Sequence, residues 1–406
     1  MDIKFTDGGV TAPKGFTANG IHCGIRKSKD KKDLALIFCE KECDTAAVYT
    51  QNLVCGAPIT VTKNNISNGK ARAVVCNSGI ANTCNADGIE KAEGMCEITA
   101  NALGISKSDI IVASTGVIGQ PLDLEPVKNG INELVSGLNK NGSDSAANAI
   151  MTTDTVKKEF ACEFTLGGKS CHIGAISKGS GMIHPNMATT LNFLTSDVAI
   201  TPELIQKALS DVVKVTYNCL SVDGDTSTND TCLVLCNGLA ENPVITEEDE
   251  DGKEFKAALA YVMEYLAKQI AGDGEGCTRL FEVTCNGAAT KEDAKIISKS
   301  VVCSTLTKAA VFGKDANWGR ILCAMGYSGV TFDPEKVDLF FESAAGRMQI
   351  IKDGVAVDYS EEEATKILSE PAVTAIADIK MGDAEATAWG CDLTYDYVKI
   401  NADYRS

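Results

Sequence analysis

The stretch of the chain best suited to chemistry is KGSGMIHPNMATTLNFLTSD, residues 178–197, which places a Pro-Asn pair shortly before Ala188 and Thr189. A threonine hydroxyl is a weak nucleophile and needs a base; at a chain N-terminus its own α-amino group serves as that base. This amine has an unperturbed pKa of about 7.7–8.0, which suits proton transfer near neutral pH. An internal Thr189 reaches this state only if the Ala188–Thr189 peptide bond is cleaved.

Self-cleavage would begin with attack of the threonine hydroxyl on the preceding carbonyl, followed by hydrolysis of the resulting ester. A small residue before the threonine and a tight upstream turn favour this attack, and Ala188 and the Pro185-Asn186 pair meet that requirement. The alternative interpretation is an ordinary buried turn leading into a strand over 189–200, because Ala-Thr pairs are common in any sequence.

Motifs of other catalytic classes are incomplete. The run EFTLGGKS has Glu163 where a phosphate-binding loop needs its first glycine, so a hairpin turn at Gly167-Gly168 explains it better. The chain has only three histidines, which disfavours a histidine-based triad or a zinc enzyme. They are scattered along the sequence at His22, His172 and His184.

The surrounding elements alternate between short apolar runs and helical patterns, which predicts an α/β layered protein. We expect a helix over 201–216 with Thr201 as N-cap, a helix over 251–272 ended by Gly272, and a third over 291–310. The second helix should bury a stripe formed by Phe255, Leu259, Val262, Leu266 and Ile270. Buried strands are predicted over 33–40, 71–79, 109–117 and 232–238.

Composition narrows the classes of function. The 406 residues are enough for two domains or one large one, and 44% hydrophobic residues allow a large core. A net charge of −17 disfavours nucleic-acid and membrane-surface roles. Without a signal-peptide pattern or a long apolar run, the sequence predicts a cytoplasmic protein. The 17 cysteines form no C-x-x-C pair and are interpreted as small buried hydrophobic residues.

Eight segments, in order along the chain, resemble the ornithine acetyltransferase family of arginine biosynthesis. The resemblance covers essentially the whole sequence and includes the stretch at 178–197. The other seven segments are GGVTAPKGF (8–16), ASTGVIG (113–119), IMTTDT (150–155), SVDGDTSTND (221–230), GDGEGCTRLFEV (272–283), FGKDANWGRI (312–321) and CDLTYDYVKINADYRS (391–406).

The resemblance implies roles for individual residues. Thr189 aligns with the nucleophile, and the cleaved bond would join Ala188 to Thr189. Thr115 and Gly116 align with the oxyanion hole, whose donors must point at the oxygen that becomes negative. Besides Thr189, the positions that align with substrate-binding residues are Thr152, Lys178, Glu275, Asn401 and Ser406.

The implied reaction is a ping-pong transfer of acetyl from N-acetyl-L-ornithine to L-glutamate through an acetyl-threonine intermediate, with no metal or redox cofactor. Some family members also take acetyl from acetyl-CoA, and the sequence does not separate the two kinds. A hydrolase of the same fold, such as an aminopeptidase or amidase, is one alternative. A cysteine-rich metal or redox protein is another.

The implied fold is an α-β-β-α layered sandwich with two central sheets and a smaller C-terminal α/β region. Self-cleavage would give an α chain of residues 1–188 and a β chain of residues 189–406, assembled as two α and two β chains. Independently of the cleavage, we place a structural boundary near 285, between lobes at 1–284 and 285–406. Thr190 and Ile80 depart from the common family pattern.

Overall fold

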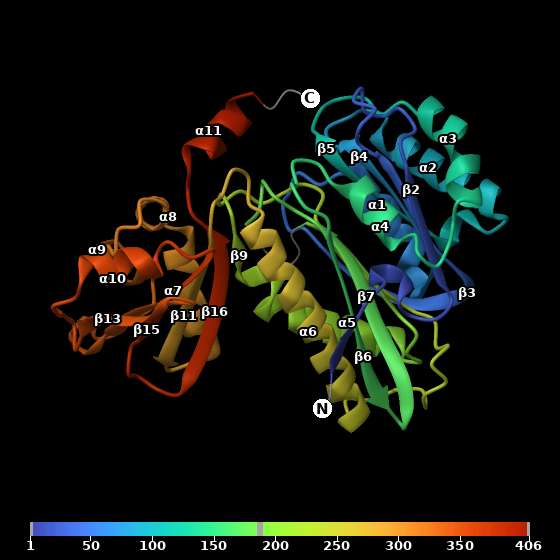
Figure 1. Cartoon of the computed structure of the whole chain (residues 1–406). Coiled ribbons are helices and arrows are strands. Elements are labelled where there is room, and N and C mark those ends of the chain that lie inside the picture. Colours follow the sequence, from blue (N-terminus) through green and yellow to red (C-terminus); the bar gives the residue numbers. More distant parts are fainter. Residues whose placement is uncertain (1–2, 185–189, 404–406) are drawn as a thin grey trace.

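The computed structural model describes residues 3–184 and 190–403. It has a mixed α/β architecture with two multi-stranded sheets, one of nine strands and one of seven (Figure 1). The α/β class with two sheets is therefore confirmed. Within the described ranges, no helix combines the length and apolar character needed to cross a membrane. The boundary near 285 stays a prediction.

The nine-stranded sheet has the strand order β1-β6-β7-β8-β10-β3-β4-β5, with β2 paired to β3. Its centre is mixed: β8 runs antiparallel to β7 but parallel to β10. The predicted hairpin joins β6 to β7, where Gly167 and Gly168 both have positive φ. The strands are β1 (Lys4–Thr6), β2 (Phe16–Ile21), β3 (Leu34–Tyr49), β4 (Lys70–Ile80), β5 (Ile110–Val117), β6 (Lys158–Leu166), β7 (Lys169–Lys178), β8 (Leu191–Ser196) and β10 (Thr231–Cys236).

The seven-stranded sheet has the order β14-β13-β12-β15-β11-β16-β9 and is built almost wholly from the last third of the chain (Figure 1). Its centre pairs β11 parallel to β15 and antiparallel to β16. The strands are β9 (Leu220–Ser221), β11 (Leu280–Ala288), β12 (Asp338–Ser343), β13 (Gly346–Lys352), β14 (Val355–Ala356), β15 (Ala372–Asp378) and β16 (Ala384–Cys391).

Helices cover both sheets. Helices α1 (Ala57–Asn65), α2 (Gly88–Leu103), α3 (Glu125–Ser136) and α4 (Ser143–Ile150) pack on the nine-stranded sheet. Helix α7 (Lys291–Cys303) packs on β11 and β16 of the other sheet. The remaining C-terminal helices are α8 (Thr305–Phe312), α9 (Trp318–Gly326), α10 (Glu361–Ile367) and α11 (Tyr395–Ala402).

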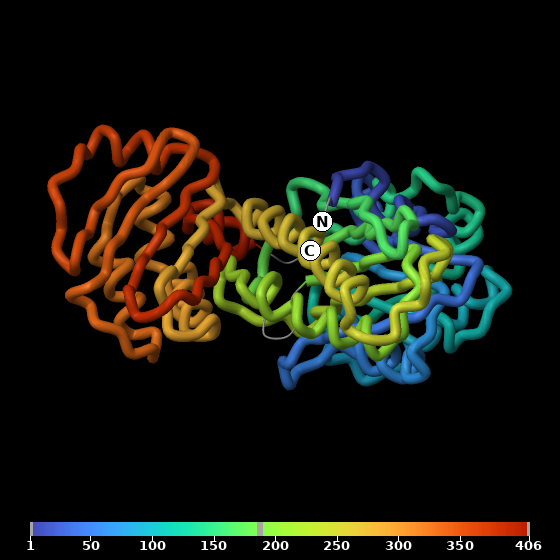
Figure 2. The backbone as a smooth tube through the Cα atoms, turned by 90° about the horizontal axis from the view of Figure 1, so that it is seen from below, coloured from blue at the N-terminus to red at the C-terminus, as the bar shows by residue number. Residues whose placement is uncertain are grey.

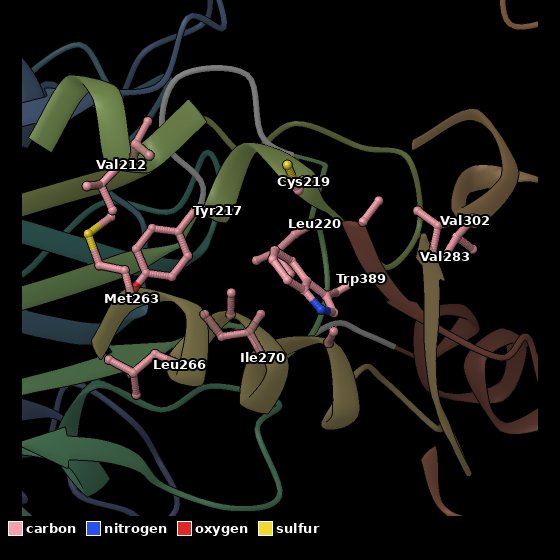
Figure 3. Packing of buried hydrophobic residues seen from close by; sticks show 14 of the residues in the cluster. Val212, Tyr217, Cys219, Leu220, Met263, Leu266, Ile270, Val283, Val302 and Trp389 are labelled. Carbon is pink, nitrogen blue, oxygen red and sulfur yellow. The ribbon is translucent and has the colours of Figure 1, made fainter. Parts of the chain in front are cut away.

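Helices α5 (Pro202–Val215) and α6 (Glu250–Gly272) lie side by side, and α6 runs between the two sheets (Figure 2). Helix α6 contacts β6 and β7 on one side and β11 and β16 on the other. One continuous hydrophobic cluster joins these elements, with Met263, Leu266 and Ile270 of α6 close to Tyr217 and Trp389 (Figure 3). All five residues of the predicted α6 stripe are buried, and the helix ends at Gly272 as predicted.

The prediction of a single third helix over 291–310 is wrong, because the structure has two helices in this range. Helix α7 ends at Cys303, and α8 begins at Thr305. Ser304 lies between them with extended backbone, and its side chain accepts a hydrogen bond from the Thr307 N–H. Serine is a preferred N-cap residue because its hydroxyl satisfies one of the free N–H groups of the first turn, so Ser304 starts a new helix.

The cysteines are mostly core residues. All 17 belong to the described part of the chain, and each is a free thiol. Eleven are buried, which agrees with their interpretation as small hydrophobic side chains. Cys55, Cys84 and Cys323 are exposed instead.

Candidate active site

The sequence-predicted residues converge where β5 and β7 end and β8 begins. A small cavity of about 20 Å³ lies there, large enough for about one water molecule. Two of the predicted residues line it, Thr115 and Lys178, together with Thr190. The cavity is lined by Thr115, Lys178, Gly181, Met182, Ile183, Thr190, Leu191, Ser227, Asn229 and Asp230. The predicted Ala188, Thr189 and Ser406 lie outside the described residues.

Thr115 and Gly116 occupy the end of β5, next to Ser78 and Gly79 of the parallel strand β4. Gly116 has φ +132°, and a Cβ atom there would lie 2.2 Å from the Gly79 carbonyl carbon. Only glycine fits such a close approach of two backbones. The preceding carbonyl, of Ser114, accepts a hydrogen bond from Asn229 Nδ2 at 3.0 Å. This end of β5 is therefore held in place by backbone packing and by a buried amide.

Thr190 has an unusual backbone. Its φ is +88°, which is rare for a β-branched residue and costs energy unless the surroundings enforce it. The Thr190 N–H donates to Asp230 Oδ1 at 2.6 Å, and its hydroxyl accepts from Asn192 Nδ2 at 2.5 Å. Its carbonyl accepts from the Thr231 N–H at 2.9 Å. The residue that follows the predicted nucleophile is thus fixed on three sides.

Asp230 was not singled out from the sequence, although it ends the segment SVDGDTSTND. Burial raises the pKa of its carboxyl group to about 8, against the lowering effects of the Thr190 N–H, Ser227 and Lys178. Asp230 therefore keeps its proton at neutral pH. A carboxyl group with a strongly raised pKa beside a cavity is typical of functional sites.

Glu275 and Asn401 form a second group close to the cavity. Asn401 Nδ2 donates to Glu275 Oε2 at 2.8 Å, so the two predicted substrate-binding residues are in contact. The Glu275 carboxylate lies against Gly181 of the cavity wall, where an added Cβ would come within 2.3 Å of its carboxylate carbon. The Glu275 N–H donates to the Ser180 carbonyl at 3.0 Å. Glu275 is 7% exposed.

Thr152 lies on the loop before β6 and does not line the cavity. Its N–H donates to Asp154 Oδ2 at 3.0 Å. The other oxygen of Asp154 accepts from the Gly179 N–H at 2.8 Å, directly after Lys178. The structure therefore connects Thr152 to Lys178 through one buried carboxylate.

His184 directly follows the cavity residue Ile183, but it does not line the cavity, and its ring contacts Ser221 and Cys303 instead. Its Nδ1 lies 3.1 Å from Ser221 Oγ and 3.5 Å from Cys303 Sγ. Burial, aided by the charge of Lys299, lowers the pKa of His184 to about 4, so the ring is neutral. In the part of the chain that the structure describes, no three or more histidine, cysteine or acidic side chains gather to hold a metal ion.

The structure describes both residues that depart from the family pattern, Thr190 and Ile80. Thr190 lines the cavity, as described above. Ile80 is partly buried at the end of β4 and packs against the hydrophobic cluster formed by α1, α2 and α3 with β4 and β5.

Comparisons with known proteins match the chain to one family. The model of the ArgJ family matches residues 17–406. The "Arginine biosynthesis bifunctional protein ArgJ" of Symbiobacterium thermophilum is 49% identical over 406 residues, which is 100% of both chains. That of Bacillus subtilis is 46% identical over 406 residues, 100% of this chain and 98% of the relative. The crystal structure of the Bacillus halodurans protein aligns with a TM-score of 0.51 and 46% identity, and covers 53% of this chain and 100% of its own.

Proposed function

The chain belongs to the ArgJ family of acetyltransferases of arginine biosynthesis, and on that premise we propose that it moves acetyl from N-acetyl-L-ornithine to L-glutamate. The observation that carries the proposal is a cavity lined by Thr115, Lys178 and Thr190. Thr190 directly follows the predicted nucleophile, Thr189, in the sequence. The full-length match to relatives at 46–49% identity supports it.

The proposed nucleophile is Thr189, freed by cleavage of the Ala188–Thr189 bond. Its α-amine takes the hydroxyl proton while the hydroxyl oxygen attacks the acetyl carbonyl carbon. The carbonyl oxygen becomes negative, and we assign its stabilisation to Thr115 and Gly116. The carbon–nitrogen bond then breaks, and the α-ammonium returns the proton to the amine of the departing L-ornithine. The acetyl group remains on the Thr189 oxygen.

The second half of the reaction reverses these steps with a different amine. The α-amine of L-glutamate attacks the acetyl ester and gives up a proton, and the threonine oxygen recovers one as it leaves. Lys178 and Glu275 provide one positive and one negative side chain, which suits substrates that carry both a carboxylate and an ammonium group. We assign substrate contacts also to Thr152, Asn401 and Ser406. The proposed steps need no metal or redox cofactor.

We further propose that the two fragments stay together after cleavage and assemble as two α and two β chains. Strands β8 and β10 belong to the second fragment, yet they lie between β7 and β3 of the first. Hydrogen bonds on both sides hold them there.

The proposal is tested by incubating the purified protein with N-acetyl-L-ornithine, with and without L-glutamate, and following release of L-ornithine. A transferase releases ornithine continuously only when glutamate is present, and forms N-acetyl-L-glutamate in equal amount. Release at the same rate without an acceptor would identify a hydrolase and contradict the proposal. Replacing acetylornithine by acetyl-CoA and following formation of N-acetyl-L-glutamate shows whether this second donor is used.

A further inference from the structure

We propose that Lys158, buried between Asp154 and Asp273, is a positioning residue that holds three substrate-binding residues in place. The inference rests on the proposed function, which assigns substrate contacts to Thr152, Lys178 and Glu275. We call Asp154, Lys158 and Asp273 the lysine cluster.

The lysine cluster joins the segment around the start of β6 to the segment after α6, 115 residues away in the chain. Lys158 Nζ donates to Asp154 Oδ1 at 2.7 Å and to Asp273 Oδ2 at 2.6 Å. The side chains of Lys158 and Asp154 are fully buried, and that of Asp273 is 7% exposed. Asp154 belongs to the loop before β6, Lys158 begins β6, and Asp273 follows the end of α6. A single ammonium group therefore ties this loop to a strand and a helix end.

Asp154 uses both oxygens to hold substrate-binding segments. Its Oδ2 accepts from the Thr152 N–H at 3.0 Å, and its Oδ1 accepts from the Gly179 N–H at 2.8 Å as well as from Lys158. Gly179 is the neighbour of Lys178 in the chain. The positions of Thr152 and Lys178 consequently depend on the orientation of one carboxylate.

Asp273 extends the same network to Glu275. Its carboxylate accepts from the N–H groups of Thr155 and Val156, which fixes the loop that carries Thr152. Its backbone carbonyl accepts from Ser180 Oγ at 2.7 Å, and the Ser180 carbonyl accepts from the Glu275 N–H at 3.0 Å. Each of the three substrate-binding residues thus lies within two residues of a group that the cluster holds.

Charge balance explains why a lysine stands at the centre. Burial alone would raise the pKa of Asp154, but the charges of Lys158 and Lys178 and the hydrogen bonds to the carboxylate lower it to about 2. Asp154 is therefore ionised at neutral pH. Without Lys158, two carboxylates would face each other in a buried site, and at least one of them would turn away or take up a proton.

The test compares Lys158→Met with Lys256→Met in the processed enzyme that contains both fragments. Lys256 also joins two carboxylates, at 2.6 Å from Asp211 and 3.1 Å from Glu248, but it is 31% exposed. Lys256 lies near the start of α6, whereas Asp273 directly follows the last residue of that helix, so the two are about 25 Å apart along the helix axis. We expect Lys158→Met to raise KM for N-acetyl-L-ornithine about tenfold or more, because losing a well-placed hydrogen bond to a charged substrate group weakens binding by about that factor. Lys256→Met should leave KM unchanged.

KM does not depend on the folded fraction of the enzyme, so a purely structural role of Lys158 would lower the melting temperature and leave KM unchanged. That result would overturn the inference. If Lys158→Met does not fold, Asp154→Asn replaces it: the amide supplies only one acceptor, so it must release either the Thr152 or the Gly179 N–H, and the same rise in KM is expected. An unchanged KM in this variant would equally overturn the inference. Absence of ornithine release by the wild-type enzyme would instead overturn the proposed function itself.

Discussion

Replacing Asp230 by asparagine should make the protein more stable near neutral pH and should change how its stability depends on pH. Asp230 is fully buried and its pKa is raised to about 8 in the folded protein, against an ordinary value of 3.8. The amide of asparagine has nearly the same shape, can still accept the Thr190 N–H, and does not ionise. The substitution therefore removes the ionisation and keeps the contact.

The expected size follows from the two pKa values. Because the folded protein binds the Asp230 proton more tightly than the unfolded chain, the contribution of Asp230 to stability is fully present below about pH 4 and is lost as the pH rises toward 8. Each pH unit in this window corresponds to about 1.4 kcal/mol. At pH 7 the unfolded carboxyl group is about three units above its pKa, so the penalty is on the order of 4 kcal/mol. The asparagine variant does not have this penalty.

The measurement is urea unfolding at several pH values between 5 and 7.5. Both proteins carry Thr189→Ala, so that neither chain is cleaved; intact mass confirms this. The difference in unfolding free energy between the protein with Asp230→Asn and the protein that retains Asp230 should increase by about 1.4 kcal/mol per pH unit. Any effect of asparagine on packing adds the same amount at every pH and does not change the slope. A difference that stays constant across this range would refute the raised pKa of Asp230.

Three further predictions concern the site directly. Thr115→Ala should lower kcat by on the order of 10²–10³ with little change in KM, because an oxyanion donor acts near the transition state; near-normal kcat with a lowered melting temperature would remove it from the donors. Thr189→Ala should abolish processing and transfer, whereas Thr190→Ala should permit both; mass and N-terminal sequencing check this, and a fragment starting at Thr190 would contradict it. Gly181→Ala should raise KM, because the added Cβ would come within 2.3 Å of the Glu275 carboxylate carbon. Gly326→Ala is the control and should leave KM unchanged, because in the described part of the chain no neighbouring atom lies within 4 Å of the added Cβ.

Periodicity was sufficient to predict the long elements from the sequence. The stripe on α6 and the strand at 232–238 follow from hydrophobic spacing, which depends on local geometry alone. The break between α7 and α8 was missed, because the helical pattern continues across Ser304 and nothing in the spacing marks a new start. Pairing in the sheets, such as β8 between β7 and β10, joins residues far apart in the chain and leaves no local signal.

The site was predictable only as far as the family motifs reach. Thr115, Lys178, Glu275 and Asn401 were assigned by resemblance, and the structure brings them to one cavity or beside it. Asp230 and the lysine cluster were missed. In sequence they are ordinary charged residues, which lie on the surface in most proteins. Only folding removes them from water and brings Lys158 and Asp273, 115 residues apart, into contact.

The insertion of β8 and β10 between β7 and β3 also constrains how the protein is made. The ribosome completes β1–β7 before either inserted strand emerges, so until then the sheet can form only as two halves, β1-β6-β7 and β3-β4-β5 with β2. Each half presents an open strand edge, which is a template for aggregation. We therefore expect the proposed cut at 188–189 to follow folding of the complete chain. If the two fragments were made as separate chains, partly folded molecules with unpaired strand edges would have to find each other by diffusion. In a single polypeptide, β8 and β10 are covalently linked to the sheet into which they insert.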